Sequence, residues 1–178
     1  MIKTNRLTLR RWTMNDLESL IKYANNKNIA RNMRDRFPHP YTREAAIDFI
    51  SQFEKENAPE IFAVDLNGEA IGSAGFFPKD DVYLKNAEFG YWIAEPYWSR
   101  GFGTEAARAI IDYGFKNFPV ERIYASVFSR NDASNKVMLK LGLKNEATFH
   151  NSVFKFGEYR DEIFYAIIRE DWKKKIAE

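Results

Sequence analysis

Alternating and helical patterns of apolar residues divide the first half of the chain into short predicted elements. Residues 6–12 alternate polar and apolar positions, which is the period of a strand with one buried face. Apolar residues then recur at helical spacing over residues 17–24, after a Thr13–Asp16 segment with the character of a capping box. Thr42 is a suitable N-cap, and residues 46–53 that follow it carry an apolar helical face. These patterns predict one strand followed by two helices.

A hairpin and a further strand are predicted next. Residues 61–66 and 69–76 read as strands joined by Asn67-Gly68, a dipeptide typical of two-residue hairpin turns. Residues 87–94 read as another strand, which Pro96 ends because proline lacks the N–H needed for strand pairing.

The second half of the chain alternates helices and strands. Helices are predicted over 101–118 and 132–141, the second ending at Gly142 in the left-handed conformation. Strands are predicted over 122–128, 143–149 and 159–169. With 178 residues and no linker rich in Pro, Gly or Ser, the chain is predicted to form a single domain, residues 1–178. The order of elements predicts an α/β (α+β) domain with one mixed central sheet flanked by helices.

Composition narrows the classes of protein that fit. The chain has no cysteine, which excludes disulfides, thiolate metal sites and cysteine nucleophiles, and its two histidines predict no metal site. Its 27 basic and 25 acidic residues are interspersed, so a dedicated nucleic-acid binder is not expected. No apolar run is long enough to span a bilayer, and the first residues lack a signal-peptide pattern. A cytoplasmic protein without a membrane partner is expected.

The clearest candidate for a binding site is the Gly101-Phe102-Gly103 turn at the start of a predicted helix. Glycines there let the backbone approach a ligand closely, and the amides at the helix N-terminus favour an anion such as a diphosphate. The alternative is a glycine-rich helix entry that binds no ligand.

The same residues also satisfy a dinucleotide-binding pattern, G-x-G-x-x-G/A, through Ala106. In that fold the first glycine closes the strand directly, whereas here residues 95–100 intervene. The next strand ends at residues 127–130 without an acid placed to bind a ribose. NAD binding is therefore not favoured.

Three stretches, taken in order, resemble the GNAT superfamily of N-acetyltransferases, in particular its RimJ/RimL type, which acetylates the N-termini of ribosomal proteins. They are residues 4–10 (TNRLTLR), residues 88–106 (EFGYWIAEPYWSRGFGTEA) and residues 131–143 (NDASNKVMLKLGL). The resemblance covers about residues 6–169, nearly the whole chain.

The resemblance implies that acetyl-CoA lies in the splay between the fourth and fifth strands, at 87–94 and 122–128. It assigns backbone groups of the fourth strand to the pantetheine arm, amides of the glycine turn to the diphosphate, and Asn131 to the pantetheine arm. Asn131 has the alternative role of capping the next helix. The implied cofactor-binding residues are Trp92, Ile93, Ala94, Arg100, Gly101, Phe102, Gly103, Thr104 and Asn131.

Two positions depart from the broad superfamily pattern. Trp98 stands where many relatives have Gln or Arg three residues before the first glycine, although tryptophan there suits the RimJ/RimL type. Met138 stands where many relatives have a tyrosine that protonates the leaving thiolate. The usual proton donor is therefore missing.

The expected reaction is direct attack of a primary amine on acetyl-CoA in a ternary complex. An aliphatic amine with a pKa of about 10 needs a base at neutral pH. Glu88 is the first candidate, by analogy with relatives that use such a glutamate, and its alternative role is a solvated or salt-bridged strand residue. Ser134 is the candidate replacement for the missing tyrosine, with a simple helix-cap hydroxyl as the alternative.

The acceptor amine is less well defined. The resemblance places a basic, aromatic loop containing Arg31, Arg34 and Arg36 at the acceptor entrance, which would favour an acceptor that carries carboxylates. A protein N-terminus and a small-molecule amine both remain open, as does a homodimer. A GNAT-fold sensor that binds acyl-CoA without catalysis is the alternative function, and Met138 is the residue that favours it.

Overall fold

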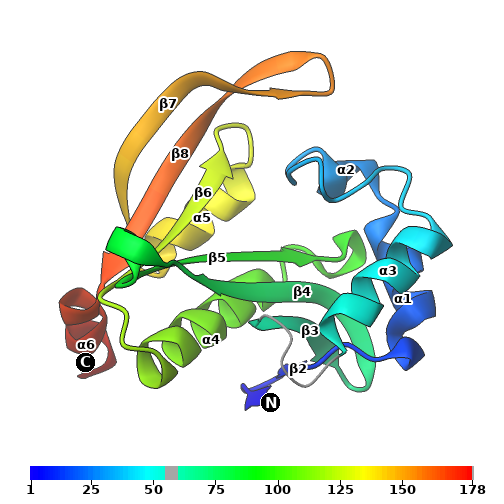
Figure 1. Cartoon of the computed structure of the whole chain (residues 1–178), viewed down its shortest axis with the longest axis horizontal. Coiled ribbons are helices and arrows are strands. Elements are labelled where there is room, and N and C mark those ends of the chain that lie inside the picture. The colour runs from blue at the N-terminus through cyan, green and yellow to red at the C-terminus, as the bar shows by residue number, and fades with distance from the viewer. Residues whose placement is uncertain (55–59, 178) are drawn as a thin grey trace. The chain divides into compact units, whose positions relative to one another are not determined.

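The computed structural model describes residues 1–54 and 60–177, which form a mixed α/β fold. Within these residues, eight strands are joined in one sheet in the order β1-β2-β3-β4-β5-β6-β8-β7. The strands are β1 (Ile2–Lys3), β2 (Thr8–Arg10), β3 (Glu60–Leu66), β4 (Glu69–Pro78), β5 (Asn86–Ile93), β6 (Arg122–Phe128), β7 (Lys144–Lys155) and β8 (Glu158–Ile168). The α-helices are α1 (Leu17–Ala24), α2 (Lys27–Ala30), α3 (Arg43–Phe53), α4 (Phe102–Asn117), α5 (Asp132–Lys140) and α6 (Arg169–Ala177). The predicted fold class is confirmed (Figure 1).

The chain divides into two compact units. The first comprises residues 1–75 and 90–109, and the second comprises residues 76–89 and 110–178. Strands β4 and β5 and helix α4 each contribute residues to both units. The predicted single domain, residues 1–178, also includes residues 55–59 and 178, which lie outside the described residues.

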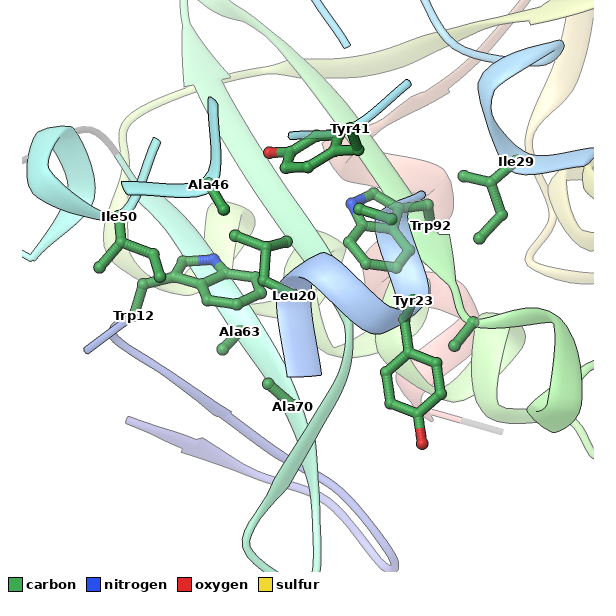
Figure 2. Close-up of a cluster of buried hydrophobic side chains, with 12 residues drawn as sticks. Trp12, Leu20, Tyr23, Ile29, Tyr41, Ala46, Ile50, Ala63, Ala70 and Trp92 are labelled. Atoms are coloured by element: carbon green, nitrogen blue, oxygen red, sulfur yellow. The ribbon is translucent and has the colours of Figure 1, made fainter. Parts of the chain in front are cut away.

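The core of the first unit is a cluster of aromatic and aliphatic side chains supplied by helices α1 to α3, strands β3 to β5 and the segments that connect them (Figure 2). Trp12 and Leu20 are almost fully buried, and the Trp12 ring meets the edge of Phe49 at 5.5 Å between centroids. Burial of each such side chain contributes about 1.5–3 kcal/mol to folding. Helices α1 and α3 pack against each other in this unit, so the apolar faces that predicted them are the faces that become buried (Figure 1).

The predicted helix caps of the first unit are present. The Thr42 side chain accepts a hydrogen bond from the Ala45 N–H at 3.2 Å, so it caps α3. The Asp16 carboxylate accepts from the Thr13 N–H at 3.0 Å, which is one half of a capping box. Both caps satisfy backbone or helix-terminal donors that would otherwise lack partners.

Asp16 also belongs to a buried ionic network with Arg10 and Asp65. Arg10 lies 2.7 Å from Asp16 and 2.8 Å from Asp65, and the side chains of the two acids are only 5% and 10% exposed. Burial raises the pKa of Asp16, but hydrogen bonds from Arg10 and Thr13 lower it more, so its net pKa lies below the usual value. This network joins β2 and β3 to the segment before α1.

Replacing Asp16 by asparagine is expected to lower the free energy of unfolding by about 2 kcal/mol at neutral pH, because a largely buried arginine loses a charged partner. A carboxyl group with a depressed folded-state pKa stabilises the protein above its unfolded pKa of about 3.9 and ceases to do so as the pH falls through the folded value. The difference between wild type and Asp16→Asn should therefore narrow below about pH 4. Urea unfolding at pH 7, 5 and 3 measures this difference in the free energy of unfolding, and Glu18→Gln, at an exposed position, is the control. A pH-independent difference would contradict the ionic explanation.

The second unit is built on the antiparallel strands β6, β8 and β7. Strand β6 pairs with β8 from Arg122↔Ile168 to Phe128↔Glu162, and β7 and β8 form a long hairpin (Figure 1). The hairpin turns at Phe156-Gly157, where both residues have positive φ values of 51° and 81°. This is the pattern of a type I′ turn, whose twist matches that of the flanking strands.

Helix α6 covers part of the second unit and was not predicted from the sequence. The Trp172 ring stacks on Phe115 at 5.0 Å between centroids, and its indole N–H donates to Asp112 at 2.7 Å. Arg169 donates to the carbonyl oxygens of Phe115, Phe118 and Val120 at 2.6–2.9 Å. The Phe115 carbonyl lies in the last turn of α4, and the other two carbonyls follow the helix. Arg169 therefore acts as a C-terminal cap for α4.

The remaining differences from the predicted elements are two short elements and one strand end. The sequence analysis missed the two-residue strand β1 and the single-turn helix α2, and it ended the seventh structural strand at residue 149 instead of Lys155. The Asn67-Gly68 turn is confirmed, with φ values of 55° and 93°. Gly142 is also confirmed in the left-handed conformation, with φ 86°.

Candidate functional site

The predicted diphosphate turn lies in the first unit, between a 3₁₀ turn at Glu95–Tyr97 and the start of α4. Gly101 has a φ of 80°, in the left-handed region that glycine occupies without strain. A Cβ atom at Gly103 would lie 3.0 Å from the Tyr91 ring, so this position also has little room for a side chain. The backbone conformation therefore favours glycine at position 101, and the contact with the Tyr91 ring favours it at position 103.

The turn leads directly into the 16-residue helix α4. The Glu105 N–H donates to the Gly101 carbonyl at 3.0 Å, which closes the first helical turn. The amides of Phe102, Gly103 and Thr104 therefore belong to the N-terminal turn, where N–H groups have no intrahelical acceptor. Together with the positive end of the helix dipole, they can bind an anion.

At the end of β5 only backbone groups are candidates for contacting the pantetheine arm, because the Trp92 side chain itself is buried. Trp92 is 8% exposed and belongs to the core cluster of the first unit, where it meets Phe37 edge-on (Figure 2). The Ala94 N–H donates to the Ile71 carbonyl of β4 at 2.7 Å. Because neighbouring residues of a strand point their backbone groups to opposite edges, the Ile93 N–H faces away from β4. Among the three predicted residues of this strand, Ile93 is thus placed to meet an added strand-like ligand.

Trp98, the residue that departs from the broad superfamily pattern, makes a defined contact. Its indole N–H donates to the Ile93 carbonyl at 2.6 Å. This bond ties the turn before α4 to the end of β5, and it occupies the Ile93 carbonyl from within the first unit.

Glu88, the candidate base, lies in the second unit and carries an ion pair. Its carboxylate is 2.9 Å from the Lys79 ammonium, and the Glu88 and Lys79 side chains are 15% and 32% exposed. Burial lowers the pKa of Lys79, but the hydrogen bond and charge of Glu88 raise it more, so the net pKa is above its usual value. The Lys79 ammonium also lies 5.6 Å from the centre of the Tyr124 ring. The alternative role of Glu88, a salt-bridged strand residue, is therefore present in the structure.

Asn131 and Ser134 also lie in the second unit, at the start of α5. The Asn131 side-chain oxygen accepts from the Ser134 N–H at 3.3 Å, so Asn131 caps α5 as its alternative role anticipated. Ser134 lies in the first turn and is partly buried. Met138, one turn further along, is 1% exposed and is part of the core, where its side chain supplies no proton donor.

The structure places the predicted residues in two groups. Glu88, Asn131 and Ser134 belong to the second unit, whereas the residues assigned to backbone binding, 92–94 and 100–104, belong to the first. Strand β5 pairs in parallel with β6 only over Asn86–Glu88 and Arg122–Tyr124, among the described residues. Strand β6 itself continues to Phe128 in its pairing with β8.

A hydrogen-bonded cluster on the β7–β8 hairpin was missed by sequence reasoning. The His150 ring nitrogen Nδ1 lies 3.1 Å from Asp161, which also accepts from the Asn151 N–H at 2.9 Å. The bond from Asn151, followed by that from His150, lowers the pKa of Asp161. The Asp161 carbonyl accepts from the Ser129 N–H at 2.9 Å, so this residue also holds the loop before α5. No sequence signal joins these residues, because their contact depends on the register of the hairpin.

The basic loop of the predicted acceptor entrance lies in the first unit. Arg31, Arg34 and Arg36 are exposed, and Phe37 and Tyr41 pack against each other at 5.0 Å between centroids. The aromatic residues anchor the loop to the core cluster, and the arginines remain at the surface.

Two other kinds of feature do not occur in residues 1–54 and 60–177. No group of three or more His, Cys, Asp or Glu side chains is placed to hold a metal ion there. No helix in that part of the chain is long and apolar enough to cross a membrane.

Comparison with known proteins identifies relatives over nearly the whole chain. A family model described as an acetyltransferase (GNAT) domain matches residues 6–144. The uncharacterized N-acetyltransferase YnaD of Bacillus subtilis (strain 168) is 33% identical over 174 residues, which is 96% of this chain and 98% of that protein.

Solved structures show the same fold. The acetyltransferase (GNAT family) from Bacillus anthracis has a TM-score of 0.82 and 28% identity, with 95% of this chain and 98% of that chain covered. RimL, the ribosomal L7/L12 alpha-N-protein acetyltransferase, solved in complex with coenzyme A, has a TM-score of 0.80 and 19% identity, with 94% and 97% covered.

Proposed function

Since this chain belongs to the GNAT family of acetyltransferases, we propose that it transfers the acetyl group of acetyl-CoA directly to a primary amine in a ternary complex. The amine nitrogen attacks the thioester carbonyl carbon, the carbon–sulfur bond breaks, and CoA leaves as a thiolate that takes up a proton. The amine loses one proton in forming the amide, so protons balance overall. Acetyl-CoA is the co-substrate of this N-acetyltransferase.

The observation that carries the proposal is the glycine turn at the start of α4. Gly101 has the left-handed conformation that the turn requires, and Gly103 lies where a Cβ atom would press on the Tyr91 ring, so the two glycines set the path of the backbone into α4. The amides from Arg100 to Thr104 would hold the diphosphate of acetyl-CoA, which is the kind of anion that a helix N-terminus accommodates well.

The limited pairing of β5 supports a place for the pantetheine arm at the end of that strand. In the described residues, parallel pairing with β5 stops after Tyr124, while β6 continues for four residues to Phe128. An extended pantetheine arm, with its two amides, would lie along the end of β5, with the Ile93 N–H as one donor. Asn131 would add a side-chain contact while it caps α5.

The reaction then needs a base, a site for the developing oxyanion and an acid. Glu88 would take the amine proton, directly or through water. A backbone N–H of β5 would stabilise the oxyanion, since such donors stabilise tetrahedral intermediates without any special side chain. Ser134 would supply the proton to the CoA thiolate in place of the tyrosine, whose position Met138 occupies.

Replacing Glu88 by glutamine tests its role as base. The variant keeps the size of the side chain, but it loses the charge that pairs with Lys79 and cannot accept the amine proton, so kcat/KM for the acceptor should fall by about 100-fold. Steady-state release of CoA, detected with a thiol reagent, measures it. Glu146→Gln is the matched control, because Glu146 is also a strand carboxylate paired with a basic residue, Arg122. Equal activity of the wild type and Glu88→Gln would assign Glu88 to structure alone.

The acceptor is proposed to be an amine that carries carboxylates, such as the N-terminus of an acidic peptide. The exposed Arg31, Arg34 and Arg36 would attract such a substrate and repel a polyamine. The RimL neighbour acts on a protein N-terminus, as its name states. A panel of acidic peptides, basic peptides, amino acids and polyamines, tested for CoA release with the purified protein, distinguishes these classes. Preference for a polyamine would overturn the acidic-acceptor proposal.

The second candidate function is a sensor that binds acyl-CoA without transferring it. The buried Met138 favours it, because the proton donor found in many relatives is missing. The same panel separates the two candidates: an enzyme releases CoA with at least one amine, whereas a sensor binds acetyl-CoA with no release across the panel.

A further inference from the structure

Arg6, near the N-terminus, contacts the glycine turn although it lies far from that turn in the sequence. Its Nη1 donates to the Arg100 carbonyl at 2.9 Å. Its Nε and Nη2 both lie 2.7 Å from Glu105 Oε2, and the guanidinium covers the Phe102 ring at 4.3 Å from its centre. A single side chain therefore contacts residues on both sides of Gly101.

Glu105 is held as firmly as the arginine that it binds. Its carboxylate accepts from the Arg6 N–H at 2.8 Å and from the Thr4 hydroxyl at 2.6 Å, and its side chain is 16% exposed. Burial raises the pKa of Glu105, but the bonds from Thr4 and Arg6 lower it more, so it stays ionised at neutral pH. Residues 4–6 are thus fixed to the first turn of α4.

The contact with the Arg100 carbonyl has a consequence for the next amide. In a planar trans peptide the C=O of one residue and the N–H of the next point in opposite directions. A carbonyl that points at Arg6 therefore turns the Gly101 N–H away from Arg6. That N–H is one of the donors assigned above to the diphosphate.

We propose that Arg6, supported by Glu105, is a positioning residue that orients the Gly101 amide toward the diphosphate of acetyl-CoA. The inference rests on the proposed function, because it takes the glycine turn as the diphosphate site. Arg6 acts through the backbone of the turn, and it recognises no atom of the acetyl group or of the acceptor. Its effect should therefore depend on the presence of the diphosphate in the donor.

The close fit at Gly101 supports a positioning role. A Cβ atom at Gly101 would lie 3.3 Å from Arg6 Nη2, so the guanidinium packs against the backbone of the turn itself. The turn also contains Ser99 with a φ of 60°, a conformation that a serine adopts only when its surroundings hold it there. Arg6 is the charged side chain that bridges this strained segment to the helix.

Two substitutions separate the contacts of Arg6. Arg6→Lys keeps a cation beside Glu105 but lacks the second arm that reaches the Arg100 carbonyl. Arg6→Met removes both contacts. Arg43→Met is the matched control, because Arg43 forms an exposed ion pair with Glu18 at 2.6 Å in the same unit. Each variant is assayed with acetyl-CoA and with S-acetylpantetheine, which carries the same thioester without the diphosphate.

With acetyl-CoA, we expect both Arg6 variants to raise KM and the dissociation constant about tenfold with kcat nearly unchanged, the effect of one misdirected hydrogen-bond donor. With S-acetylpantetheine, kcat/KM should stay within about twofold of wild type. Arg43→Met should match wild type with both donors. Melting temperatures are measured in parallel, and Arg6→Lys decides the matter if Arg6→Met does not fold.

The outcomes separate this inference from the proposed function. Wild-type binding of acetyl-CoA with unchanged binding by Arg6→Lys overturns the positioning role and leaves the function standing. An equal loss with both donors also overturns it, because the effect would then not depend on the diphosphate. No binding of acetyl-CoA by folded wild-type protein would refute the proposed cofactor site itself.

Discussion

Replacing Gly101 by valine is expected to weaken acetyl-CoA binding by at least about 100-fold, which corresponds to about 2.8 kcal/mol. The φ of 80° at this position is strongly disfavoured for a β-branched residue, at a cost of about 1–3 kcal/mol. The new Cβ would also press on the Arg6 guanidinium. The turn can relieve this strain only by changing its backbone conformation, and its amides then no longer converge on one anion.

Calorimetric titration with acetyl-CoA measures the effect, with NAD and ATP as negative controls. Gly68→Val is the matched substitution, because Gly68 also has a positive φ, 93°, but it lies in the β3–β4 hairpin, where a Cβ would meet no atom within 4 Å. It should lower stability to a similar extent and leave the affinity of folded protein near that of wild type. Wild-type affinity in Gly101→Val would return the glycine turn to a purely structural role.

Replacing Gly72 by alanine is expected to lower the free energy of unfolding by about 3 kcal/mol. Gly72 lies in β4, and a Cβ there would collide with the carbonyl oxygen of Trp92 and come within 3.1 Å of the Ile93 Cα. Both atoms belong to the backbone of β5, so no side-chain rotation can make room. Strand β5 would have to move, and the Ile93 N–H proposed to meet the pantetheine arm would move with it.

Urea unfolding followed by circular dichroism measures the loss of stability, and titration with acetyl-CoA measures the loss of affinity. Gly90→Ala is the stability control, because Gly90 is also a strand glycine, and a Cβ there would meet no atom within 4 Å. Its unfolding free energy should change by at most about 1 kcal/mol. If Gly72→Ala is as stable as wild type, then β4 and β5 can accommodate a Cβ atom at this position, and the predicted clash is wrong.

The features predicted correctly from the sequence are mostly local. The Asn67-Gly68 turn and the left-handed Gly142 follow from backbone sterics within a few residues. The Thr42 and Asn131 caps follow from side chains that reach an amide three residues ahead. The glycine turn could likewise be recognised from its spacing, since glycine positions report directly on backbone conformation.

The features that sequence reasoning missed depend on partners that are distant in the chain. Arg6 and Glu105 are 99 residues apart, and nothing in either segment indicates the other. Lys79 lies near Glu88 in sequence, but their ion pair depends on the conformation of the loop that connects β4 and β5. Helix α6 is rich in lysine and has no strong apolar face, so the sequence pattern did not predict it. Its contacts, through Trp172 and Arg169, form only in the folded protein.

The bond between the Trp98 indole and the Ile93 carbonyl bears on the affinity for a cofactor. It joins the turn proposed for the diphosphate to the strand end proposed for the pantetheine arm, within one compact unit. Two parts of the proposed binding surface would then be preorganised before any ligand is present. Less conformational entropy is lost on association, so a larger share of the contact energy is available as affinity.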